Sequence, residues 1–70
     1  MRRTLYITKK DRSGKTIMDM DRAVFAGSGK LWFMIYKGKV YDATLLNNNY
    51  YRTLPDDKGN YFLSFIFSEE

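Results

Sequence analysis

Hydrophobic and polar positions alternate along much of this chain, as in strands with one buried face. Residues 3–8 place Leu5 and Ile7 on one side and threonines with a tyrosine on the other. A cluster of charged residues, Ser and Gly over residues 10–14 marks a turn, after which residues 15–19 can return as a second strand. The chain therefore predicts an antiparallel pair of strands at its start.

The next segment has the spacing of a helix instead of a strand. Met20 and Val24 are four residues apart, Asp19 is a suitable N-cap, and Gly27 is a suitable residue just after a helix end. These features predict one short helix near residues 20–26.

The middle of the chain predicts a hairpin. Residues 31–36 are apolar at every position, which favours a central strand covered on both faces. Lys37 and Gly38 form a tight turn, and residues 40–46 alternate between apolar and polar side chains. This is the pattern of two antiparallel strands joined by two residues.

Turn residues also divide the last third of the chain. Three asparagines at 47–49 predict a turn before a short strand at 50–54. Residues 55–60 contain Pro, Asp, Gly and Asn and predict another turn, followed by a final, buried strand at residues 61–67.

Together these elements predict one small β-rich domain spanning residues 1–70, all-β or α+β. Five or six strands form an antiparallel meander with one short helix, and the sheet either curls into a small barrel or packs against that helix. The segment YKGKVYDATL at residues 36–45 resembles the first hairpin of Tudor and other SH3-like barrels, in which an aromatic residue, Lys-Gly-Lys, an aromatic, an acid and Ala follow in order. The resemblance covers about a seventh of the chain and implies an SH3-like barrel; no binding residue is transferred from it.

Composition points toward binding and away from catalysis. The chain has twelve aromatic residues and twelve Lys/Arg but no His and no Cys. The commonest catalytic and metal-binding groups are thus missing, and we expect no enzyme, no metal and no cofactor. The first apolar run, residues 5–7, is too short for a signal-peptide core or a membrane span, so we expect a cytoplasmic protein without membrane contact.

Three short motifs are better explained by structure than by chemistry. Residues 27–30, Gly-Ser-Gly-Lys, resemble the tail of a phosphate-binding loop but lack its first Gly and the Ser or Thr after the Lys. Asp19 with Asp21 can share one face of a strand and hold Mg²⁺, but no further acidic residue or His supports them. A flexible connector accounts for residues 27–30, and capping and turn formation account for Asp19 with Asp21 and for Asp56 with Asp57.

The positive charge is concentrated in the first half of the chain. Residues 1–39 carry ten Lys/Arg and three Asp, which is +7, whereas residues 40–70 carry two and five acidic residues, which is −3. A basic half favours an anionic partner, either nucleic acid or an acidic protein surface.

Tyrosines and cations are interleaved along the strands, so a sheet face can present rings beside positive charges. Rings can stack on unpaired bases while cations follow the phosphates. The residues predicted to supply the positive field are Arg2, Arg3, Lys9, Lys10, Arg12 and Lys15. The residues predicted to make closer contacts are Lys37, Lys39, Tyr50, Tyr51 and Arg52.

Two functions fit these features. The first is a non-enzymatic binding module that contacts nucleic acid or a nucleic-acid-handling complex. The alternative is a small protein-docking regulator or inhibitor, of the type that phages and mobile elements encode, which binds and blocks another protein through Tyr and Arg contacts. A short chain with an open sheet edge can also pair with a partner strand or with a second copy, so a homodimer is a further expectation.

Overall fold

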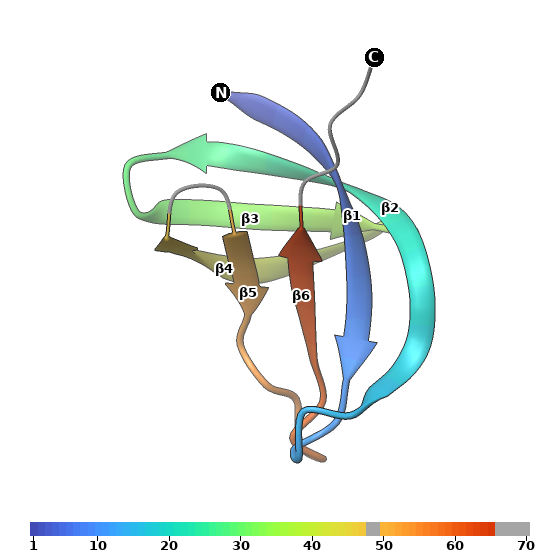
Figure 1. Ribbon diagram of the computed structural model, residues 1–70. Coiled ribbons are helices and arrows are strands. Elements are labelled where there is room, and N and C mark those ends of the chain that lie inside the picture. Colours follow the sequence, from blue (N-terminus) through green and yellow to red (C-terminus); the bar gives the residue numbers. More distant parts are fainter. Residues whose placement is uncertain (48–49, 66–70) are drawn as a thin grey trace.

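The computed structural model describes residues 1–47 and 50–65, which form six strands and no helix (Figure 1). Each strand pairs antiparallel with the next, and the last pairs with the first, so the sheet closes into a barrel. The small β-rich meander is confirmed and is consistent with an SH3-like barrel. The predicted turn residues 48–49 and the end of the predicted last strand, residues 66–67, lie outside the described residues. The strands are β1 (Arg2–Lys10), β2 (Thr16–Ser28), β3 (Leu31–Tyr36), β4 (Lys39–Asn47), β5 (Tyr50–Thr53) and β6 (Tyr61–Phe65).

The helix predicted near residues 20–26 is wrong, because this segment belongs to β2, the long curved strand of Figure 1. Strand alternation turns Ala23 and Phe25 into the core, where they are 3% and 1% exposed. The same strand pairs with β1 on one side and with β3 on the other. Burial and two ladders of hydrogen bonds outweigh the local spacing of Met20 and Val24, because propensity is only a weak preference.

Gly27 does not end a helix; it lies inside β2 opposite Trp32. Its φ is 152°, and a Cβ at this position would clash with the carbonyl oxygen of Leu31. Only glycine allows β2 and β3 to approach so closely beside their two-residue turn.

The β3–β4 hairpin forms as predicted, with Lys37 and Gly38 between the strands. The two faces of β3 differ, however. Trp32, Met34 and Tyr36 point into the core, but the alternate residues are exposed. The expectation that both faces are covered is therefore wrong, because a closed barrel has one interior and no described element lies over the outer face of β3.

The core is built largely from aromatic side chains. The Tyr51 ring lies against both Phe25 and Trp32, with ring centroids 4.9 Å and 4.8 Å away. Such offset and tilted ring pairs add to the stabilisation from buried apolar area. The buried apolar residues are Leu5, Ile7, Ala23, Phe25, Trp32, Met34, Tyr36, Ala43, Tyr51 and Phe62.

Side-chain hydroxyls help to close the barrel between β5 and β6. The backbone pairing of these strands is centred on Arg52 and Leu63. On either side, the backbone N–H of Tyr51 donates to Ser64 Oγ at 2.6 Å, and that of Phe62 donates to Thr53 Oγ1 at 2.9 Å. Both hydroxyls are buried, so these bonds satisfy backbone groups that water cannot reach.

Two loops lie together at one end of the barrel, at the bottom of Figure 1. They are residues 11–15, between β1 and β2, and residues 54–60, between β5 and β6. Their contact is close, since a Cβ on Gly59 would lie 3.0 Å from the Cβ of Arg12. Among the described residues, no helix is long and apolar enough to cross a membrane.

Candidate functional site

Three aromatic rings from three strands meet near this end of the barrel. Tyr36 ends β3, Tyr41 lies near the start of β4, and Phe62 lies near the start of β6. The Phe62 centroid lies 5.3 Å from each tyrosine centroid, with the rings tilted or edge-on. Barrel closure makes this meeting possible, because Phe62 is 21 residues from Tyr41 and 26 residues from Tyr36 in sequence.

Each ring carries a lysine over its face. The ammonium nitrogen lies 5.9 Å from the ring centroid for Lys9 on Phe62, 5.4 Å for Lys37 on Tyr36 and 5.7 Å for Lys39 on Tyr41. A cation over an aromatic face is attracted by the ring quadrupole, by about 0.5–1 kcal/mol at exposed sites. The rings therefore orient three positive charges. We call these six residues the basic-aromatic cluster: Lys9, Lys37, Lys39, Tyr36, Tyr41 and Phe62.

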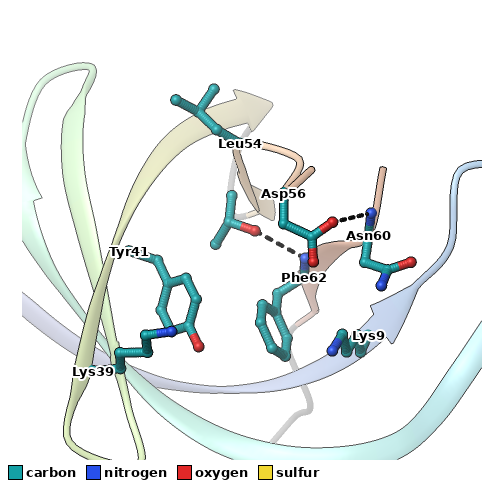
Figure 2. A pocket seen from close by; sticks show the side chains of 8 residues that line it. Lys9, Lys39, Tyr41, Leu54, Asp56, Asn60 and Phe62 are labelled. Carbon is teal, nitrogen blue, oxygen red and sulfur yellow. Dashed lines mark hydrogen bonds between the residues drawn. The ribbon is translucent and has the colours of Figure 1, made fainter. Parts of the chain in front are cut away.

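A pocket of about 190 Å³ opens beside this cluster (Figure 2). Figure 2 shows the Tyr41 and Phe62 rings next to each other, with Lys39 beside the first and Lys9 beside the second. The lysine amines and the Asn60 amide thus surround an apolar floor. This arrangement suits a ligand in which an anionic group is attached to a flat or apolar group. The lining residues are Lys9, Lys39, Tyr41, Thr53, Leu54, Asp56, Asn60 and Phe62.

The carboxylate in the pocket wall already has partners within its own loop. Asp56 Oδ1 accepts from the backbone N–H groups of Asn60 at 2.9 Å and Lys58 at 2.8 Å. These bonds, with nearby Lys9 and Lys58, hold the pKa of Asp56 below its ordinary value. Asp56 is therefore ionised and shapes the loop. The pocket lining still has a net positive charge, because it contains two lysines and one carboxylate.

The loop between β1 and β2 brings further predicted cations to the same end. Asp11 Oδ1 accepts from Ser13 Oγ at 2.7 Å and from the backbone N–H groups of Ser13 and Lys15 at 2.9 and 3.0 Å, which lowers the pKa of Asp11. Lys10 Nζ donates to Thr16 Oγ1 at 2.8 Å, and Arg12 is exposed in the loop. Lys10, Arg12 and Lys15 thus lie near residues 54–60, the loop that also lines the pocket with Lys9 and Lys39.

The remaining predicted residues do not line the pocket. Arg2 and Arg3 begin β1, eight residues from its other end, opposite Ala26 and Phe25. Arg52, on β5, lies over the Tyr61 ring at 5.1 Å.

The two adjacent tyrosines of β5 have opposite surroundings. Tyr50 is 45% exposed, whereas Tyr51 is 1% exposed and belongs to the core. The Tyr51 hydroxyl accepts a hydrogen bond from Arg3 Nη1 at 3.1 Å. The prediction that Tyr51 contacts a ligand is therefore wrong, because its ring is enclosed by Phe25 and Trp32.

Of the acidic pair, Asp21 serves the fold, whereas Asp19 is exposed. Asp21 Oδ2 accepts from the Tyr36 hydroxyl at 2.7 Å. This bond lowers the pKa of Asp21 and raises the pKa of Tyr36 to about 12, so Tyr36 stays protonated at neutral pH. In the described part of the chain, no three His, Cys, Asp or Glu side chains come together as metal ligands.

Comparison of the chain with protein-family models, with curated protein sequences and with solved structures finds no match. The site therefore depends on its geometry alone. Sequence reasoning named its three lysines but left Phe62 out, because the last predicted strand is apolar on both faces and alternation does not show which face is inside.

Proposed function

We propose that this protein is a non-enzymatic binding module whose basic-aromatic cluster binds the phosphate backbone of nucleic acid. The observation that supports this proposal most directly is the convergence of Lys9, Lys37 and Lys39 on one ring cluster beside a pocket. Three oriented ammonium groups from β1, the β3–β4 turn and β4 form a surface that neutralises several phosphates at once.

Ring burial defines the mode of binding. Tyr36 and Phe62 are 8% and 7% exposed, so they hold lysines and do not offer a face to a base. Tyr41 is half-buried and can provide at most one stacking contact. Phosphate contacts carry little sequence information. We therefore expect binding that is largely independent of base sequence and strongly dependent on salt.

Single lysine substitutions with a matched control test this proposal. Lys9→Ala and Lys39→Ala each remove one charge from the pocket, whereas Lys30→Ala removes one charge from the β2–β3 turn outside the cluster. Affinity for a labelled single-stranded oligonucleotide is measured by fluorescence anisotropy across a salt series. Each pocket variant should bind more weakly and reduce the salt slope by about 0.7, the value for one lost phosphate contact on a single strand.

The Lys30→Ala variant should keep the wild-type slope. Equal losses in all three variants would mean that the net charge attracts the oligonucleotide and that the cluster is not a site. Wild-type affinity in the Lys9→Ala, Lys39→Ala double variant would contradict the proposal. An acidic protein surface would then be the better candidate for the partner of these lysines.

A further inference from the structure

The outer face of β2, β3 and β4 carries a contiguous apolar patch that the proposed nucleic-acid site does not use. Leu31 is 77% exposed, Phe33 47%, Ile35 39% and Val40 64%. The ladders connect them, because Ile35 lies opposite both Val24 on β2 and Val40 on β4. Contiguous exposed apolar side chains mark interaction surfaces, whereas single ones do not. We call Val24, Ala26, Leu31, Phe33, Ile35 and Val40 the outer apolar face.

Barrel closure limits how a partner can dock. Because β1 pairs with both β2 and β6, the first and last strands of the described meander are joined. The strand pairing with a partner or a second copy that the sequence suggested is left with segments that have a ladder on one side only, such as residues 16–23 of β2. The outer apolar face instead offers a partner exposed side chains.

One row across this face has opposite charges at its two ends. Arg2, Ala26, Phe33 and Asp42 lie opposite one another on four successive strands, from β1 to β4. Both charged residues are exposed. From β1 to β4, the row therefore consists of a cation, a small apolar residue, a large apolar residue and an anion.

The next row is apolar at three of its four positions. Thr4, Val24, Ile35 and Val40 lie opposite one another on the same four strands. Together the two rows form a band with a charged rim, as in protein–protein interfaces with an apolar centre and a polar edge.

Each row is complementary to the same row of a second copy when that second row runs in the opposite direction. A two-fold axis that runs along the strands between β2 and β3 places Arg2 opposite Asp42 of a second copy and Ala26 opposite Phe33 of a second copy. Each charge then meets its opposite, and the large ring meets the smallest side chain of the row. A two-fold interface requires this kind of self-complementary patch. We propose that the protein forms a homodimer through its outer apolar face.

Sedimentation equilibrium without nucleic acid tests this proposal, and its result is independent of the proposed nucleic-acid function. The wild type should self-associate between about 1 µM and 1 mM. Phe33→Glu should abolish this association. Ile17→Glu is the matched control, because Ile17 is equally exposed at 47% but lies at the opposite end of β2. A wild type that stays monomeric at about 1 mM would overturn the proposal.

Charge reversal tests the pairing itself. Arg2→Asp alone and Asp42→Arg alone each place like charges opposite one another, and each should raise the dimer dissociation constant by about tenfold or more. The double variant Arg2→Asp, Asp42→Arg restores opposite charges and should recover the affinity. Circular dichroism verifies that each variant folds.

Single variants that keep the wild-type dissociation constant, or a double variant as weak as the single ones, would overturn the two-fold arrangement.

Discussion

The hydroxyl groups between β5 and β6 lead to a sharp stability prediction. Thr53→Val keeps the shape of a side chain that is 2% exposed but removes the acceptor of the Phe62 backbone N–H. Leaving a buried donor without a partner costs about 1–3 kcal/mol. A domain of 70 residues has about 4–10 kcal/mol of stability in total, so this one atom accounts for a large share of it.

The expected loss is large enough to measure in a thermal melt. In a domain of this size, 1 kcal/mol corresponds to about 4–8 °C in Tm, so a loss of about 2 kcal/mol lowers Tm by about 8–16 °C. Ser64→Ala should act in the same way, because it removes the acceptor of the Tyr51 N–H at 2.6 Å. Urea unfolding followed by circular dichroism gives the free energy of unfolding directly.

Two comparisons isolate the hydroxyl group. Thr53→Ser keeps the acceptor and loses only a methyl group, worth about 0.8 kcal/mol. Thr44→Val makes the same chemical change at an exposed position of β4 and should alter stability by no more than about 0.5 kcal/mol. If Thr53→Val were as stable as Thr44→Val, the hydroxyl bonds would not hold the barrel closed and the reasoning would be refuted.

Two further predictions concern buried and paired polar groups. Thr8 is 8% exposed and its hydroxyl has no hydrogen-bond partner among the described residues, so Thr8→Val should raise the free energy of unfolding by about 1 kcal/mol; a lower value would show that the hydroxyl is bonded. The Asp21–Tyr36 bond lowers the pKa of Asp21 from its ordinary value of 3.8 and raises the pKa of Tyr36 from 10.0 to about 12. Its stabilisation of the fold is therefore fully present between about pH 3.8 and pH 10.0, and it is lost below and above this range. Tyr36→Phe should therefore cost more stability at about pH 7 than at about pH 2.5, and an equal cost at both would contradict this linkage.

Much of the fold is predictable from alternation and turn residues. Leu5 and Ile7 define the inner face of β1, and Lys37-Gly38 defines the turn of the central hairpin. The error at residues 20–26 has a physical cause, because a four-residue spacing followed by Gly27 fits both a helix and a curved strand. Tertiary contacts distinguish the two, namely the ladders with β1 and β3 and the close approach of β3 to Gly27.

The candidate site was only partly predictable. Lys37 and Lys39 are neighbours in sequence, but Lys9 joins them only because the barrel brings β1, β4 and β6 to one pocket. Tyr50 and Tyr51 show a second limit. Adjacent strand residues point to opposite faces, so only one of the two rings can lie inside the barrel. Tyr51 is the inner ring because it packs against Phe25, and composition does not reveal this contact.

The most direct test of the central claim is a titration of the wild-type protein with labelled single-stranded DNA, duplex DNA and RNA at about 50 and 200 mM salt. The label belongs on the nucleic acid, because Trp32 is 5% exposed and its indole N–H donates to the Gly29 carbonyl at 2.8 Å. Three lysine–phosphate contacts predict saturable single-strand binding that weakens about 20-fold between the two salt concentrations. Absence of binding at about 50 mM salt, or an affinity that does not change with salt, would contradict a phosphate-binding function for the basic-aromatic cluster.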